Sequence, residues 1–198
     1  PLVQGAAAMQ LHDNEALCQV INKFQQHGVI AIADEVMTGF GKTGTYFASD
    51  QIGAKPDVMC LSKALTGGIM PMAITSCTSN IYEAFYDDEL AKGLFHGHTY
   101  SGNPLGCAVA SAAIDLLTSK EIQENIKRIT TSNLAFKTKI ESHTAVAAVR
   151  TKGVILAVDL AIEMERYGNK RNEMFQWFWQ RGLFLRPLGK TVYIVPPF

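Results

Sequence analysis

The chain has 198 residues, of which 47% are hydrophobic and 18% are charged, as in ordinary globular proteins. The 18 Lys and Arg balance the 18 Asp and Glu, so we expect no nucleic-acid or membrane-surface partner. No apolar run approaches the roughly 18 residues of a membrane-spanning helix, and we expect no signal peptide. Four scattered cysteines without CxxC spacing predict reduced thiols in a cytosolic protein: Cys18, Cys60, Cys77 and Cys107.

An amphipathic helix is expected over residues 13–27. Asp13 is a good N-cap, Gly28 is a good stop, and apolar residues recur between them at helical spacing, namely Leu17, Val20, Ile21 and Phe24. The helix is placed to act as the crossover of a βαβ unit that leads into the next strand.

Two short apolar runs, Val29–Ala33 and Val58–Leu61, predict buried strands. The first run ends at the acidic pair Asp34 and Glu35, and Lys63 follows the second run closely. In open α/β sheets, parallel strands end on one edge, and ligands bind outside their carboxyl ends. We therefore expect Asp34 and Lys63 to meet over one ligand.

An Asp and a Lys at one sheet edge have two interpretations. The simpler interpretation is a salt bridge or a pair of solvated loop charges. The other is a pyridoxal phosphate site, in which a lysine amine condenses with the cofactor aldehyde and a carboxylate pairs with the protonated pyridine nitrogen.

The surrounding sequence favours the cofactor. The segments IADEVMTGFGKTG and PDVMCLSKALTGG resemble the active-site signature of class III aminotransferases, which are fold type I enzymes. The resemblance implies that pyridoxal 5'-phosphate is the cofactor, that Lys63 is the catalytic and substrate-contacting amine, and that Asp34 holds the ring nitrogen. On an extended chain Val36 points the same way as Asp34, so we expect it to pack on the ring.

Two other motifs overlap this stretch. Gly39, Gly41 and Gly44 fit the dinucleotide fingerprint G-x-G-x-x-G, but residues 45–56 lack the long helix that this motif must open. A P-loop ending at Gly41 needs a glycine at position 36, which is Val36. We therefore reject both nucleotide sites.

Further along, the sequence predicts a strand at Met72–Ser76, a short helix at Asn80–Tyr86 and a helix beginning at Pro104. Between them lies the polar loop FHGHTYSGNP, residues 95–104. It is an ordinary surface loop or a loop held against a ligand. Its two histidines lack a third ligand nearby, so we expect no metal.

The class III resemblance gives this loop a specific role. It implies that the loop crosses the interface of a homodimer and binds the cofactor phosphate of the neighbouring subunit. His98, through its backbone N–H, and Thr99, through its hydroxyl, are the expected phosphate ligands. Gly97 is expected close to the substrate.

A change to charged, amphipathic sequence at residues 118–121 marks the expected domain boundary. We expect an α/β fold of type I, in which residues 1–118 belong to the large, mostly parallel-sheet domain and residues 119–198 to an incomplete small α+β domain. The second part predicts a helix at Lys120–Ser142, a hairpin around Gly153, a helix at 170–181 that buries Met174, Phe175 and Phe178, and two strands within 183–198.

Arg186 is a surface cation or a carboxylate ligand, since a guanidinium can grip a carboxylate with two parallel hydrogen bonds. The segment RPLGKTVYIVPPF resembles the biotin-pathway members of class III, which implies that Arg186 binds the keto-acid carboxylate. The expected reaction converts 8-amino-7-oxononanoate (7-keto-8-aminopelargonate) to 7,8-diaminopelargonate in the cytoplasm. The expected amino donor is S-adenosylmethionine, and lysine is the alternative donor.

Other interpretations remain open at this stage. The chain is alternatively an ω-amino-acid aminotransferase or an aminomutase, whose pocket need not place an arginine at position 186. It is alternatively a catalytically silent piece. PLVQGA resembles a segment near the middle of the class III proteins, and in that family the glycine-serine loop that binds phosphate precedes this segment.

Overall fold

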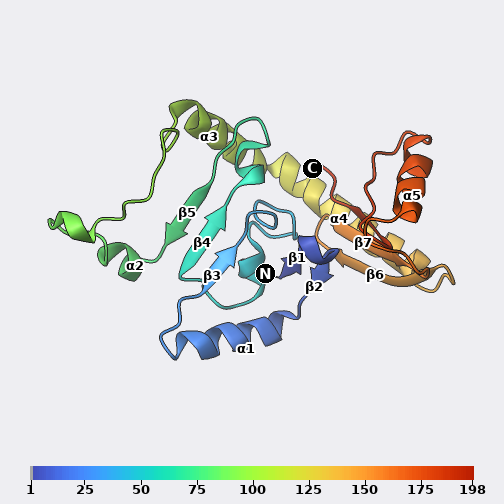
Figure 1. The fold of residues 1–198 in the computed structure, drawn as a ribbon, viewed down its shortest axis with the longest axis horizontal. Helices are drawn as coiled ribbons and strands as arrows, with labels where there is room; N and C mark the ends of the chain where they lie inside the picture. Colours follow the sequence, from blue (N-terminus) through green and yellow to red (C-terminus); the bar gives the residue numbers. More distant parts are fainter. Residues whose placement is uncertain (1) are drawn as a thin grey trace. The chain divides into compact units, whose positions relative to one another are not determined.

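The computed structural model describes residues 2–198, which form two compact units (Figure 1). The first unit comprises Leu2 and residues 13–40 and 47–119. The second comprises residues 3–12, 41–46 and 120–198. The second unit thus also takes two short segments from before the expected boundary. No helix among residues 2–198 is long and apolar enough to cross a membrane.

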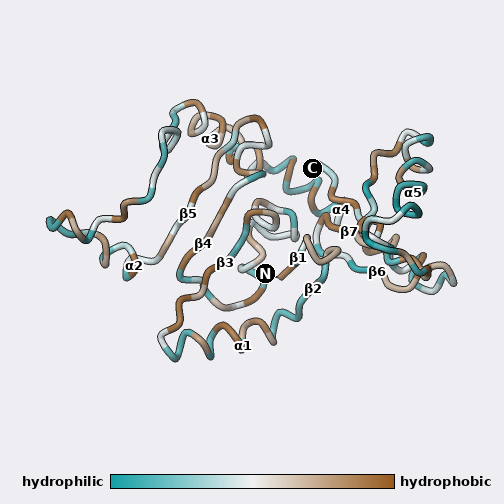
Figure 2. Tube along the Cα trace, in the orientation of Figure 1, coloured by the Kyte–Doolittle hydropathy of each residue, from teal (hydrophilic) through white to brown (hydrophobic). Residues whose placement is uncertain are grey.

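The first unit contains a three-stranded sheet in the order β3-β4-β5. Its strands are β3 (Ile32–Asp34), β4 (Val58–Leu61) and β5 (Ile74–Cys77). β3 is parallel to β4, whereas β5 is antiparallel to β4. The strand predicted at 58–61 is confirmed, and Figure 2 shows β4 as a hydrophobic stretch.

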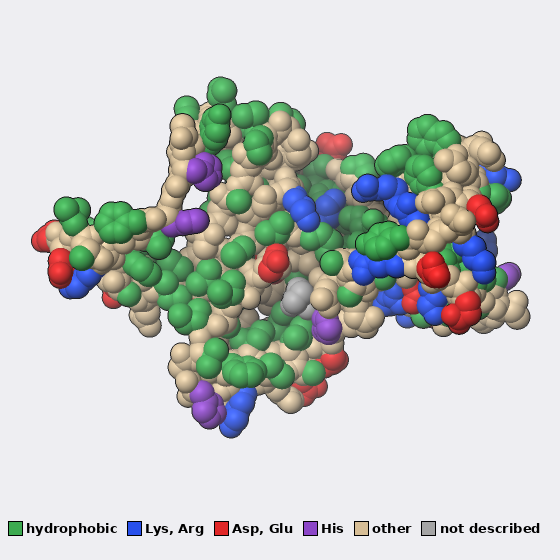
Figure 3. Space-filling model, viewed as in Figure 1, with side chains coloured by type: hydrophobic (Ala, Val, Ile, Leu, Met, Phe, Trp, Pro, Cys, Tyr) green, Lys and Arg blue, Asp and Glu red, His purple; other side chains and the backbone are tan. Residues whose placement is uncertain are grey.

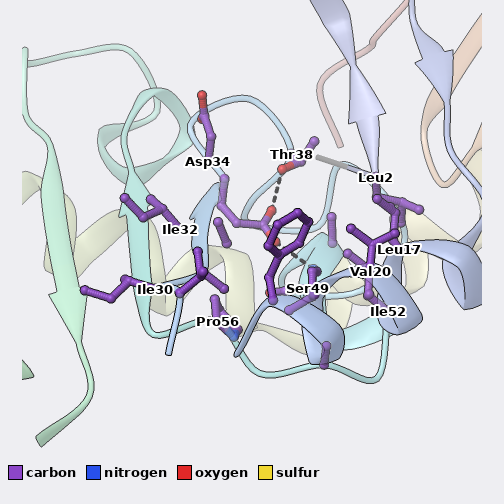
Figure 4. Close-up of a pocket in the computed structure, with 18 residues that line it drawn as sticks. Leu2, Leu17, Val20, Ile30, Ile32, Asp34, Thr38, Ser49, Ile52 and Pro56 are labelled. Atoms are coloured by element: carbon purple, nitrogen blue, oxygen red, sulfur yellow. Dashed lines mark hydrogen bonds between the residues drawn. The ribbon is translucent and has the colours of Figure 1, made fainter. Parts of the chain in front are cut away.

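The expectation that the run from Val29 forms a buried strand is wrong. The strand begins only at Ile32, and the side chain of Ile32 is 65% exposed. The reason is topological: among the described residues β3 is paired only with β4, so it forms a sheet edge. Its apolar side chains line an open cavity of about 310 Å³ beside the first helix (Figure 4).

Local capping explains where the helices of the first unit begin. In α1 (Asn14–Gln25), the carboxylate of Asp13 accepts a hydrogen bond from the backbone N–H of Ala16 at 2.8 Å. In α3 (Pro104–Thr118), the side chain of Asn103 accepts from the backbone N–H of Leu105 at 2.9 Å. Both helix starts confirm the sequence prediction. The short α2 spans Ser79–Glu83.

Short 3₁₀ helices lie in the first unit at Ala48–Gln51, Lys63–Thr66 and Leu90–Lys92, and in the second unit at Gly5–Ala7. The one at Lys63–Thr66 packs against α3 through a buried cluster, which consists of Phe40, Leu61, Leu65 and Ala110. Leu65 is fully buried in it. The backbone of Lys63, which begins this 3₁₀ helix, is therefore held by the packing of Leu65 in the buried cluster.

The second unit is built on an antiparallel sheet in the order β6-β7-β8. Its strands are β6 (Val146–Lys152), β7 (Ile155–Leu160) and β8 (Thr191–Ile194). α4 (Lys120–Ile140) packs against this sheet, α5 spans Asn169–Trp179, and a two-stranded ribbon is formed by β1 (Val3–Gln4) and β2 (Gln10–Leu11). The hairpin predicted around Gly153 is confirmed.

Two expectations for the second unit are wrong. No residue of α5 is fully buried, and Met174, Phe175 and Phe178 are only half-buried. Only one strand forms within residues 183–198, because the segment before Thr191 contributes a single bridge from Leu188 instead of a ladder. Pro187 lacks an N–H and is a poor strand residue.

A half-buried ion pair joins β6 to β7. The guanidinium of Arg150 donates to both carboxylate oxygens of Asp159, at 2.5 and 2.8 Å, and the hydroxyl of Thr191 donates to Asp159 at 2.7 Å. Arg150 also donates to the carbonyl oxygens of Ala8 and Met9, which ties residues 3–12 to the sheet. The hydrogen bond from Arg150 is the main reason that the pKa of Asp159 lies below its usual value.

The pair sets a pH dependence for this sheet. Because the folded state lowers the pKa of Asp159, its stabilisation is complete above the unfolded pKa of about 3.9 and is lost as the pH falls through the lower folded value. At neutral pH, Asp159→Ala should lower the free energy of local unfolding of this sheet by about 2–3 kcal/mol. The substitution leaves the half-buried guanidinium of Arg150 without its carboxylate partner. Hydrogen exchange of the β7 amides measures this change.

The matched control is Glu124→Ala, which removes the exposed i,i+4 pair between Lys120 and Glu124. Its effect should stay below about 0.5 kcal/mol. Equal effects of the two substitutions would contradict the role given to Asp159.

Candidate active site

The pairing of β3 with β4 places the two central side chains. The strands run parallel and in register, with Asp34 opposite Cys60. Lys63 follows Cys60 by three residues and begins the 3₁₀ helix beyond β4. Neighbouring strands lie about 4.8 Å apart, so the carboxylate and the amine arise from adjacent points of one carboxyl edge.

The carboxylate of Asp34 is exposed, and one of its oxygens is held in place. Its Oδ1 accepts a hydrogen bond from the backbone N–H of Val36 at 3.0 Å. In Figure 4 the carboxylate points away from Ser49 and from the cavity behind the strand. Its other oxygen makes no hydrogen bond with residues 2–198, so it is available to a ligand at this edge. Val36 is half-buried.

Lys63 combines a fixed backbone with a free amine. Its φ of +52° lies in the left-handed region, which is uncommon for a residue with a side chain. The backbone on each side is anchored: the hydroxyl of Ser62 donates to the carbonyl of Met72 at 2.8 Å, and Leu65 is buried. Within residues 2–198 the amine makes no hydrogen bond or ion pair, and the side chain is exposed.

The predicted phosphate ligands His98 and Thr99 lie elsewhere, as does Gly97, which was expected close to the substrate. They belong to an exposed arm that spans residues 82–102, leaves α2 and returns to α3 (Figure 1). The backbone N–H of His98 donates to Oγ of Ser101 at 3.1 Å within the arm itself. In a single chain, therefore, the structure does not bring this segment to Asp34 and Lys63.

The arm exposes several large apolar side chains, and Figure 3 shows hydrophobic groups over this end of the first unit. Phe95 is 82% exposed, and the others are Tyr86, Leu90, Leu94 and Tyr100. Within the described part of the chain, residues 87–103 form their hydrogen bonds only with partners in the range 87–107. The arm is thus held by its own turns.

Arg186 belongs to the second unit, whereas Asp34, Lys63 and the arm belong to the first. Its side chain is exposed and makes no hydrogen bond or ion pair with residues 2–198, and it precedes the buried Pro187. A free guanidinium next to a fixed residue is able to bind a carboxylate. No group of His, Cys, Asp and Glu side chains within residues 2–198 could hold a metal ion.

Glu35, the residue next to Asp34, was expected at the strand end but was given no role. Glu35 is 2% exposed, and its carboxylate accepts hydrogen bonds from the hydroxyl of Thr38 and from the backbone N–H of Ser49. The signal for it was present, because successive side chains of a strand point to opposite faces. One member of an acidic pair at the tip of a strand must therefore face inward.

Comparison with known proteins identifies the family. Residues 1–198 match the aminotransferase class III family. The chain belongs to this family. It is 40% identical to adenosylmethionine-8-amino-7-oxononanoate aminotransferase of Synechococcus elongatus and 37% identical to the protein of that name from Corynebacterium glutamicum. Both matches cover 100% of this chain and 46% of the relative, so the chain spans about half the length of these relatives.

Solved structures agree in fold. The adenosylmethionine-8-amino-7-oxononanoate aminotransferase of Methanocaldococcus jannaschii superimposes with a TM-score of 0.89 at 33% identity, over 99% of this chain and 47% of that one. An amine transaminase from an uncultivated Pseudomonas species, in its PLP-bound form, gives 0.89 at 28% identity over 98% and 46%. The expected fold, α/β of type I, is confirmed.

The class III aminotransferases depend on pyridoxal phosphate, and the residues at the β3–β4 edge fit this cofactor. A free lysine amine is the group that condenses with its aldehyde, and an exposed carboxylate with one unengaged oxygen is the group that pairs with its ring nitrogen. The amine of Lys63 and the carboxylate of Asp34 therefore have the chemistry that the cofactor of this family requires.

If Lys63 is the cofactor-bearing amine, Lys63→Ala in the full-length protein should abolish transamination and remove the visible absorbance of covalently held cofactor. Lys23→Ala removes an exposed amine at the end of α1 and should change neither property. Full turnover by the Lys63 variant would refute the assignment.

Proposed function

We propose that the protein to which this chain belongs transfers an amino group to 8-amino-7-oxononanoate, giving 7,8-diaminopelargonate for biotin synthesis. The observation that carries the proposal is that Asp34 ends β3 and Lys63 lies just beyond the adjacent, parallel β4, in a chain of this family. The names of the most similar relatives supply the substrate. Four unpaired cysteines fit a cytoplasmic location.

Bound at this edge, pyridoxal phosphate would supply an electron sink for the α-carbon of an amino donor. The chain's own residues do the rest. The amine of Lys63 holds the cofactor and then, once freed, carries a proton to and from the reacting carbon. The carboxylate of Asp34 binds the protonated ring nitrogen, and Val36 packs on the ring.

Arg186 is our candidate for the substrate carboxylate. Its guanidinium is exposed and engaged by nothing within residues 2–198, and a planar fork matches a carboxylate better than a lysine ammonium does. Gly97 has no side chain, and a Cβ there would meet only Oγ of Ser101, at 3.7 Å. We propose that it leaves room for the substrate.

The function is tested by mixing the full-length protein with 8-amino-7-oxononanoate and either S-adenosylmethionine or lysine as donor. We expect conversion with S-adenosylmethionine. Arg186→Ala should raise the KM for the keto acid about 10- to 100-fold through loss of a charge-assisted bidentate contact. Arg186→Lys should recover only part of this loss.

Conversion of simple ω-amino acids with no turnover of 8-amino-7-oxononanoate would instead favour an ω-amino-acid aminotransferase. Absence of turnover with every donor and acceptor, despite bound cofactor, would reject transamination. Lys190→Ala is the matched control, since it removes an exposed cation four residues away that has no proposed contact with substrate.

We further propose a homodimer in which Thr99 and the backbone N–H of His98 bind the cofactor phosphate of the other subunit. Two features support this. The arm lies away from the strand ends of its own chain, and it exposes apolar side chains that a partner would cover. Most homo-oligomers are two-fold dimers, in which each arm would serve the opposite site.

Mixed dimers test this arrangement. Lys63→Ala subunits lack the amine but keep Thr99, whereas Thr99→Val subunits lack the hydroxyl but keep Lys63. Random mixing of the two inactive or impaired proteins should restore about a quarter of the sites, because half of the dimers are hybrids with one complete site. If Thr99 acts within its own subunit, mixing will restore nothing.

A further inference from the structure

Glu35 is the one fully buried charged side chain among the residues that the structure describes. We propose that it is a positioning residue, whose task is to fix the orientation of the Asp34 carboxylate at the β3–β4 edge. The inference rests on the proposed role of Asp34 toward the cofactor. No step of the proposed reaction uses Glu35 itself.

The surroundings of the Glu35 carboxylate are polar but contain no cation. Oε1 accepts from the backbone N–H of Ser49 at 2.7 Å, and Oε2 accepts from the hydroxyl of Thr38 (dashed in Figure 4). No Lys, Arg or His within residues 2–198 forms a salt bridge with it. Burying a carboxylate on neutral donors is costly, and an apolar side chain would fill this space at lower cost.

The backbone of Glu35 is fixed as tightly as its side chain. Its N–H donates to the carbonyl of Cys60 at 3.0 Å, which continues the β3–β4 ladder. Its carbonyl accepts from the N–H of Gly39 at 2.9 Å. A Cβ on Gly39 would lie 2.8 Å from this carbonyl oxygen, so the close turn requires glycine.

A single peptide plane links this anchor to Asp34. The carbonyl of Glu35 and the N–H of Val36 belong to one planar peptide group, so fixing the carbonyl also fixes the N–H. That N–H is the donor to Oδ1 of Asp34. The buried side chain of Glu35, the turn at Gly39 and the exposed carboxylate of Asp34 are therefore mechanically coupled.

The coupling has a consequence for function. With Oδ1 held by Val36, the other oxygen of Asp34 keeps one direction toward a ligand. Hydrogen bonds weaken steeply as their angles become poor, so a loosened carboxylate would bind a ring nitrogen less well. Loss of the Glu35 side chain should thus affect the reacting centre more than substrate binding.

The test compares Glu35→Ala, Glu35→Gln and Thr38→Val with Leu2→Ala in the full-length protein. Leu2 is 1% exposed and lines the same cavity as Glu35, but its side chain forms no hydrogen bond with Asp34, so it controls for lost stability alone. In cofactor-free protein, Glu35→Ala should speed hydrogen exchange at the amides of Val36 and Gly39. Leu2→Ala should lower the melting temperature without this local effect.

With cofactor bound, Glu35→Ala should lower kcat about 10- to 100-fold at nearly constant KM for the keto acid, as expected when hydrogen bonds to a charged group are lost. The visible circular dichroism of the cofactor should change in the same sense as in Asp34→Asn. Glu35→Gln keeps an acceptor for Ser49, so its effects should be smaller, and Thr38→Val should be intermediate.

Parallel losses of kcat and melting temperature in Glu35→Ala and Leu2→Ala would overturn the inference, as would unchanged exchange at Val36. If Glu35→Ala does not fold, Thr38→Val and Glu35→Gln decide the question by the same measurements. Failure of the proposed function is a separate result: Asp34→Asn would then leave the cofactor spectrum unchanged.

Discussion

The parallel, in-register pairing of β3 with β4 is the constraint on which the candidate site depends. It aligns Asp34 with Cys60, and so brings the strand that ends in a carboxylate beside the strand that leads to Lys63. A slip of one residue would exchange the faces of all the side chains on β3. Asp34 would then turn inward, and Glu35 would turn toward the ligand.

Features fixed by short-range chemistry were predictable from the sequence. Asp13 and Asn103 mark the starts of α1 and α3, because a short polar side chain satisfies the first free amides of a helix. The position of β4 followed from its apolar run. Burial was less predictable: β3 lies at a sheet edge and α5 is half-exposed, because burial depends on which distant segments cover a face.

The candidate site likewise has a part that could be predicted from the sequence and a part that could not. That Asp34 and Lys63 share one edge could be predicted, since parallel strands end together. The place of residues 97–99 could not, because a glycine-containing polar loop carries no pattern that fixes its direction. The hydrogen bonds of the arm are local and Phe95 is exposed, so these local turns do not fix the direction of the arm.

The acidic pair shows why neighbouring residues of the same chemistry have different tasks. Along a pleated strand, Asp34 faces solvent and Glu35 faces the interior, so the two carboxylates meet different donors. The shorter side chain accepts from a backbone N–H two residues away, and the longer one reaches Ser49, 14 residues along the chain. Exchanging the two acids would preserve charge and composition yet leave neither carboxylate with its donors, because the lengths and directions no longer match.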